Sequence, residues 1–158
     1  MIIGNKEIFA VEFKTENDNP KMGYAKLWIQ NNFLGTIEDL IFLHGYLIGL
    51  LDQILRSKPI PFEIENKTKK DIFQLVKSTD DQRSDYALIG STFVDDFETY
   101  SFENNKTIFI IWKLRTDQEM IFEELKNYST DVHFASVSKT DVEKVKEKLL
   151  IEIAKTII

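Results

Sequence analysis

The strongest constraint on the fold is a repeated pattern of short runs in which apolar and polar side chains alternate. In the most regular run, 107–115, Ile108, Ile110, Trp112 and Leu114 occupy every second position. A period of two is typical of β-strands, because successive side chains point to opposite faces of a sheet. The pattern predicts strands over 7–14, 23–30, 33–37, 86–90, 97–103, 107–115 and 131–137.

The connections between several of these strands are short. Asn31-Asn32 separates two of them, and the four residues 103–106 join the two arms of a hairpin. Asparagine suits such turns because it tolerates the left-handed backbone region. Parallel strands need a crossover of a dozen or more residues, so these connections favour antiparallel pairing.

Helical periodicity marks the segments between and after the strands. Apolar residues spaced at three and four predict a helix over 43–56, within which Gly45 and Gly49 indicate either a close approach of another element or simple tolerance. Three further helices are predicted by a capping residue ahead of an apolar face. They are 69–77 after Thr68, 117–127 after Thr116, and a C-terminal helix capped by Thr140. The expected fold is α+β, an antiparallel sheet of hairpin-paired strands with two to four helices packed on it in two layers.

The chain is expected to form a single domain over residues 1–158. No linker, internal repeat or low-complexity tract interrupts the predicted elements. The start lacks the basic and then apolar pattern of an export signal. The most apolar window, 40–51, is shorter than the roughly 20 residues that cross a bilayer. We therefore expect a soluble cytoplasmic protein without membrane contact.

The negative charge is concentrated in one segment. Residues 79–105 contain seven acids and one base, a net charge of −6, whereas the other residues hold 19 acids and 19 bases. With a pI near 5.0, the chain is not expected to bind nucleic acid. A solvated surface, a Ca²⁺ or Mg²⁺ site and a partner-binding surface all remain open, although the glycine of a sharp calcium loop is absent. The candidate partner-binding residues are Asp80, Asp81, Asp85, Asp95, Asp96 and Glu98.

No motif predicts a catalytic residue, a metal site or a cofactor. Cysteine is absent, and His44 and His133 are the only imidazoles, without the spacing of a metal-binding pair. We expect His44 to be a partly buried, hydrogen-bonded residue of a helix, and His133 to point to the polar face of a strand. Phosphate-binding glycine motifs are also missing. A chain with 26 acids always permits a carboxylate pair, so a small enzyme with an acidic cleft remains an alternative.

Several segments together resemble a known family. Met1-Ile2-Ile3-Gly4 with Phe9-Ala10-Val11-Glu12-Phe13 is similar to the start of immunity protein family forty-two of bacterial polymorphic toxin systems. The likeness continues through residues 27–32 and the first helix, and it returns at residues 96–104 and at Ile111-Trp112. Thr36 and Asp96 depart from the family pattern, which often has Asp and Gly at these places.

The resemblance implies a non-enzymatic protein without a cofactor, which binds and neutralises a cognate toxin. A basic surface on that toxin would fit the acidic segment. Two rival functions use different features of the chain. One is a small hydrolase-like enzyme with an acidic cleft, and the other is a structural or oligomerisation module that pairs through the apolar helix 43–55.

Overall fold

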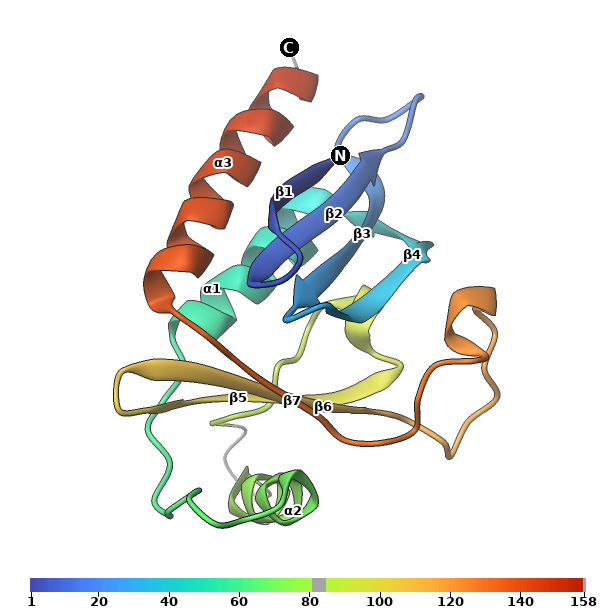
Figure 1. The fold of residues 1–158 in the computed structure, drawn as a ribbon. Coiled ribbons are helices and arrows are strands. Elements are labelled where there is room, and N and C mark those ends of the chain that lie inside the picture. Colours follow the sequence, from blue (N-terminus) through green and yellow to red (C-terminus); the bar gives the residue numbers. More distant parts are fainter. Residues whose placement is uncertain (81–84, 158) are drawn as a thin grey trace.

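The computed structural model describes residues 1–80 and 85–157, with the side chain of residue 157 left out. Its strands form two antiparallel sheets, which we call sheet A and sheet B (Figure 1). Sheet A has the order β1-β2-β3-β4, with β1 Ile2–Asn5, β2 Phe9–Thr15, β3 Met22–Ile29 and β4 Asn32–Phe42. Sheet B has the order β5-β6-β7, with β5 Phe97–Asn104, β6 Thr107–Leu114 and β7 His133–Val137.

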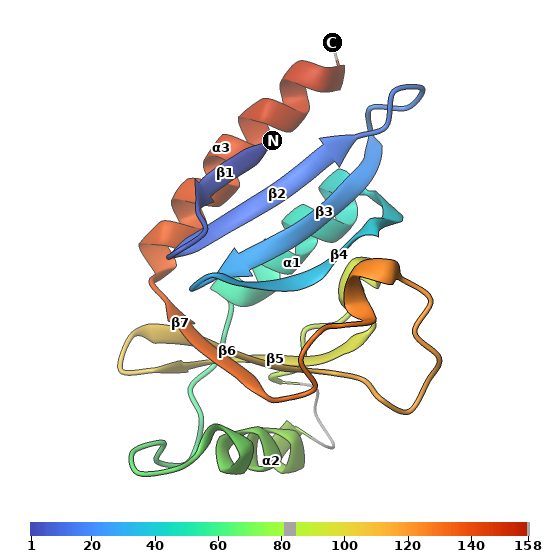
Figure 2. The same ribbon diagram turned by 45° about the vertical axis from the view of Figure 1, so that its right-hand side comes forward.

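The helices cover one face of each sheet. The π-helix η1 (Leu43–Ile48) runs into α1 (Gly49–Leu55), which lies with α3 (Lys139–Ile157) behind sheet A, while the other face of the sheet is turned to the viewer (Figure 2). Helix α2 (Lys69–Asp80) lies on the side of sheet B that is remote from sheet A (Figure 1). The predicted α+β class, with antiparallel hairpin-paired strands and packed helices, is confirmed. The strands are divided between two sheets.

Sheet B forms a middle layer because both of its faces are apolar. Ile108, Ile110 and Trp112 belong to a large buried cluster with side chains of sheet A, α1 and α3. Ile111 and Phe102 belong to a second cluster with α2. Strand β6 thus has side chains buried on both faces of sheet B, which explains why apolar residues occupy almost every position of this strand.

Two-residue turns close the predicted hairpins. Gln30 and Asn31 have φ angles of 49° and 68°, and Asn105 and Lys106 have 50° and 65°. Positive φ at both central residues is the conformation that matches the twist of paired strands. The first turn is therefore Gln30-Asn31, one residue earlier than the predicted Asn31-Asn32.

The first predicted helix is present, but its first six residues form a π-helix. The two glycines within this segment have different surroundings. A Cβ atom on Gly45 would lie 2.6 Å from the ring of Phe42, whereas nothing lies within 4 Å of a Cβ on Gly49. The close approach of the Phe42 ring therefore explains why a glycine occurs at position 45. At position 49 the glycine is only tolerated, since there is room for a side chain.

Three local predictions are wrong or shifted. Residues 86–90 make only an isolated bridge between Ala87 and Tyr100, because the amide of Gln53 hydrogen-bonds both backbone groups of Ile89 at 3.0 and 2.6 Å. In place of the helix 117–127 there is a loop with the 3₁₀ turn η3 (Glu123–Leu125). Helix α3 is capped by Ser138, which accepts a hydrogen bond from the Asp141 N–H at 3.1 Å, not by Thr140.

The burial pattern of the loop before η3 explains why residues 117–127 do not form the predicted helix. Met120 and Phe122 pack against the core, while Ile121 between them is 71% exposed. Alternate burial of consecutive apolar residues is the pattern of extended chain, not of a helix. Strand β1 was also not predicted, since its four residues are too few for a pattern of alternation to be recognised.

Candidate partner-binding surface

The acidic segment contributes to two different parts of the molecule. Asp80 lies at the end of α2, is buried, and accepts hydrogen bonds from the backbone N–H groups of Tyr86 and Ala87 at 2.5 and 3.1 Å. It therefore fixes the chain that follows the helix, and it presents little carboxylate to a partner. Asp81 lies outside the described residues.

Two further acids of the segment are held in ion pairs. Asp85 Oδ1 lies 2.8 Å from Lys58 Nζ, and Glu98 Oε2 lies 3.1 Å from Lys77 Nζ. The second oxygen of Glu98 lies 3.9 Å from the guanidinium of Arg115. The charge of Asp85 and Glu98 is thus locally balanced on the α2 side of sheet B.

The remaining pair, Asp95 and Asp96, lies at the other side of the fold, next to β4. The 3₁₀ turn η2 (Thr92–Val94) packs on β4 because Gly35, with a φ of 100°, leaves room for the ring of Phe93. A Cβ at Gly35 would meet that ring at 2.7 Å. The turn brings Asp95, which is exposed, and Asp96, which is largely buried, beside Asp39 of β4.

The carboxylates of this group repel one another. Desolvation by burial raises the pKa of Asp95 and of Asp96, and the negative charge of Asp39 raises both further. Arg115 and a hydrogen bond from the Gln118 side chain to Asp96 Oδ1 at 3.2 Å offset only part of this effect. Among the described residues, none of the three acids has an ion-pair partner within 4 Å.

Asp39 belongs to a bulge in the edge strand of sheet A. Gly23 of β3 pairs with Ile41, but Ala25 pairs with Thr36, so that one residue of β3 lies opposite the four residues 37–40 of β4. Extra residues on one strand break the regular pairing and push the chain outward. In the bulge, Ile37 is 38% and Leu40 45% exposed.

A buried network holds the start of the bulge in place. Glu124 Oε1 accepts hydrogen bonds from the Thr36 hydroxyl and from the Ile37 N–H, both at 2.6 Å. Glu38 Oε2 accepts a hydrogen bond from the backbone N–H of Glu124 at 2.8 Å. The N–H of Ile37, which does not pair with β3, is thus satisfied by a side chain of η3.

Lys26 completes this network with a charge. Its Nζ lies 3.0 Å from Glu124 Oε2, and both side chains are mostly buried. Desolvation raises the pKa of Glu124, but the hydrogen bonds from Thr36, Lys26 and Ile37 together outweigh it, so the pKa is lowered overall. Glu124 is therefore a carboxylate with hydrogen-bond partners for both oxygens, unlike the exposed Asp95.

A hollow of about 530 Å³ lies next to the bulge on the uncovered face of sheet A. Ile37 lines it together with residues of both charges and the chain end, which include Met1, Glu12, Lys14, Glu16 and Tyr24. The hydroxyl of Tyr24 donates to Glu16 Oε2 at 3.3 Å, and the Trp28 indole donates to Glu12 Oε2 at 2.7 Å. The hollow therefore carries acidic side chains and an aromatic one together with the exposed Lys14.

A model of the immunity protein 42 family matches residues 1–152 of the sequence. The chain belongs to this family. The resemblance inferred from the start of the sequence and from the hairpin residues is thereby confirmed, and so is the expected function as an immunity protein. No curated protein gave a match in the sequence comparison.

The immunity protein also has a similar solved structure. The crystal structure of CdiI from Burkholderia dolosa AUO158 superposes with a TM-score of 0.63, covering 96% of this chain and 99% of that chain. The two sequences are 12% identical, so the likeness extends to the fold alone.

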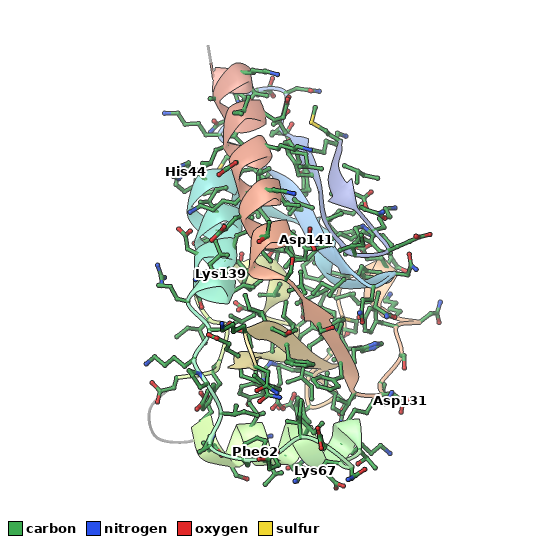
Figure 3. The ribbon with its side chains drawn as sticks, turned by 60° about the vertical axis from the view of Figure 1, so that its left-hand side comes forward. His44, Phe62, Lys67, Asp131, Lys139 and Asp141 are labelled. Carbon is green, nitrogen blue, oxygen red and sulfur yellow. The ribbon has the colours of Figure 1, made fainter. Side chains whose placement is uncertain are left out.

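The two histidines of the immunity protein do not meet the expectations drawn for them. His44 is exposed and lies on the outer side of η1, where its ring centroid is 6.5 Å from that of Phe42 (Figure 3). His133 is half-buried, with its ring stacked on Trp112 at 5.3 Å. Burial lowers the pKa of His133, because the charged imidazolium is poorly solvated there.

Within residues 1–80 and 85–157, no group of three or more acidic or histidine side chains is arranged to hold a metal ion. No described helix is both long and apolar enough to cross a membrane.

Sequence reasoning missed the part of the surface that β4 contributes. Asp39, Ile37 and Leu40 were not selected, although Glu38 and Asp39 interrupt the apolar run between Gly35 and Ile41. Two acids within an otherwise apolar strand are a signal for a bulge or an exposed edge. Glu124 left no comparable signal, because its partners lie 87 and 88 residues away along the chain.

Proposed function

We propose that this immunity protein neutralises a toxin by binding it directly, as a stoichiometric inhibitor and not as an enzyme. Membership of the immunity protein 42 family over residues 1–152 is the observation that carries this proposal. The inhibitor acts in the cytoplasm of the cell that makes it, where it meets the toxin before damage occurs. Its partner is the toxin encoded beside it.

The toxin presents a basic surface to this protein. The support is the segregation of charge, since residues 79–105 carry the whole net charge of −6. An acidic surface speeds the encounter with a basic partner and disfavours other partners. Asp85, Asp95, Asp96 and Glu98 are the candidates for this contact, with Asp81 as a further candidate from the sequence. Asp80 and Asp96 are weaker candidates because both are buried and their carboxylates already accept hydrogen bonds within the chain.

Co-expression with the protein encoded immediately upstream tests the proposal. We expect growth to be rescued by the wild-type immunity protein, and the purified pair to form a one-to-one complex in size-exclusion chromatography. The binding isotherm should saturate at one immunity protein per toxin domain, as a stoichiometric inhibitor requires. Failure of the wild-type protein both to bind and to rescue would contradict the proposed function for that toxin.

The contribution of charge is tested with a second variant. Asp85→Asn/Asp95→Asn/Glu98→Gln removes three acids but keeps Asp80, so a loss of folding does not obscure the result. We expect slower association and a weaker dependence of the rate on salt, because charge steering is screened by ions. An association rate equal to that of the wild-type protein at low salt would count against the acidic contact.

A further inference from the structure

The bulge in β4 has features of a preformed contact element for another protein. We define the bulge surface as Ile37, Asp39 and Leu40 of β4 with Asp95 after η2, and the adjacent Asp96 is buried. Ile37 and Leu40 are 38% and 45% exposed, although apolar side chains on neighbouring strand positions, such as Ile41, are buried. Other apolar side chains of the chain are exposed to a similar extent, but these two lie three residues apart in one bulge and are both available to a partner.

The bulge is held rigidly. Glu124 and Thr36 satisfy the backbone N–H groups of Ile37 and Glu38, at 2.6 and 3.1 Å. The Glu38 carboxylate is bound in turn by the Glu124 N–H. A contact element whose conformation is fixed in advance loses less conformational entropy on binding.

The surrounding charges select the partner. Asp39 precedes Leu40 in the bulge, its charge acts on Asp95 and Asp96, and no described residue pairs with any of the three acids within 4 Å. Lys26, the nearby cation of β3, is already paired with Glu124. An apolar partner alone would leave three carboxylates that repel one another, whereas lysine or arginine side chains would relieve that repulsion.

We propose that the bulge surface is the part of this immunity protein that contacts the toxin. The toxin face that it binds consists of apolar side chains bordered by lysine or arginine. The proposal rests on the proposed function, because the occupant is the toxin itself. It also assigns a role to Glu124, which positions the bulge without touching the partner.

Other exposed apolar side chains serve as matched controls. Ile8, at the turn between β1 and β2, is 48% exposed, and Ile151 of α3 is 56% exposed. The hollows that contain these two residues are also lined by Lys148. The acids that line these hollows, Glu152 and Asp141, are thus accompanied by lysine, so the controls offer exposed apolar side chains with a border of mixed charge.

The test is isothermal titration of the toxin domain encoded immediately upstream with three forms of the protein. We expect Ile37→Ala/Leu40→Ala to weaken the affinity by about tenfold or more, since central apolar contacts dominate interface energy. The control Ile8→Ala/Ile151→Ala should bind within about twofold of the wild-type protein. Thermal unfolding of each variant shows whether it is folded.

The acidic border is tested in the same way. Asp39→Asn/Asp95→Asn should lower the association rate about tenfold at low salt, and this difference should shrink as salt is added. Its control is Asp18→Asn/Glu147→Gln, which removes two exposed acids elsewhere. Hydrogen exchange of the wild-type complex should show protection at residues 37–42.

The outcomes separate the two proposals. If the wild-type protein does not bind the toxin domain, both the proposed function and this inference fail for that toxin. If the wild-type protein binds but the folded bulge variants bind equally well and residues 37–42 gain no protection, the inference is overturned and the proposed function stands.

Discussion

Two carboxylate sites next to the β4 bulge show how the same chemical group serves opposite purposes. At the first site, Glu124 accepts hydrogen bonds from Thr36, Ile37 and Lys26, and its pKa is lowered. At the second site, Asp95 and Asp96 face Asp39, and the pKa of both is raised. A carboxylate whose charged form is held by hydrogen bonds stabilises the fold, whereas the carboxylate of Asp95 is exposed and available to an external cation.

Removing the Glu124 carboxylate should have the largest effect. Glu124→Ala leaves Lys26 buried without its counter-charge and removes the acceptor for Thr36 and Ile37. Breaking a buried ion pair from one side costs about 3 kcal/mol. We expect a loss of this size in the free energy of unfolding, measured by urea denaturation.

The matched control for this variant is the neighbouring glutamate. Glu123 pairs only with Lys126 and its side chain is 75% exposed. Glu123→Ala should change the free energy of unfolding by less than about 0.5 kcal/mol. Equal losses in the two variants would mean that Glu124 is no more important than a surface residue.

A second buried acid, Asp80, should give an intermediate effect. Asp80→Ala removes the acceptor of two backbone N–H groups, those of Tyr86 and Ala87. Leaving buried donors without a partner costs about 2 kcal/mol. We expect a corresponding decrease in the midpoint of thermal unfolding.

Asp85→Ala is the control for Asp80. It removes an acid whose partner, Lys58, is 60% exposed, and such surface pairs contribute at most about 1 kcal/mol. If Asp85→Ala destabilised the protein as much as Asp80→Ala, the distinction between a folding and a surface role within the acidic segment would fail.

Local pattern was sufficient to predict most of the elements but not how they meet. The hairpin of β5 and β6 was predictable because Ile108 to Leu114 alternate and Asn105 suits the turn. The division into two sheets had a weaker signal, the apolar character of Phe109 and Ile111 on the second face of β6. Their burial depends on α2, which lies about 30 residues earlier in the chain.

The candidate surface was predictable only in part. Asp95 and Asp96 were selected for their place in the acidic segment, but Asp39 lies more than 50 residues earlier and enters only through the packing of Phe93 on Gly35. Conversely, Asp80 belongs to the same segment and is buried. Charge density along the chain does not distinguish a carboxylate that accepts backbone hydrogen bonds from one that faces water.

The smallest expected effect concerns the exposed carboxylate of Asp95. Asp95→Asn should raise the free energy of unfolding at neutral pH by at most about 0.5 kcal/mol, because the neutral amide avoids the desolvation cost of the charged carboxylate, which the attraction of Arg115 does not fully offset. The control Asp18→Asn removes an exposed acid from the loop after β2 and should leave stability nearly unchanged.

The pH dependence of this gain follows from the raised pKa of Asp95 and Asp96. Between the unfolded value near 3.8 and the higher folded value, the folded wild-type protein binds more protons than the unfolded chain, so lowering the pH through this range favours its folded state. The advantage of Asp95→Asn should therefore be largest near pH 7 and disappear as the pH falls towards 3.8. Urea denaturation of both proteins over this range measures the difference. A gain that persisted in acid would arise from packing at residue 95 and not from its charge, and the contrast between the two carboxylate sites would lose its electrostatic basis.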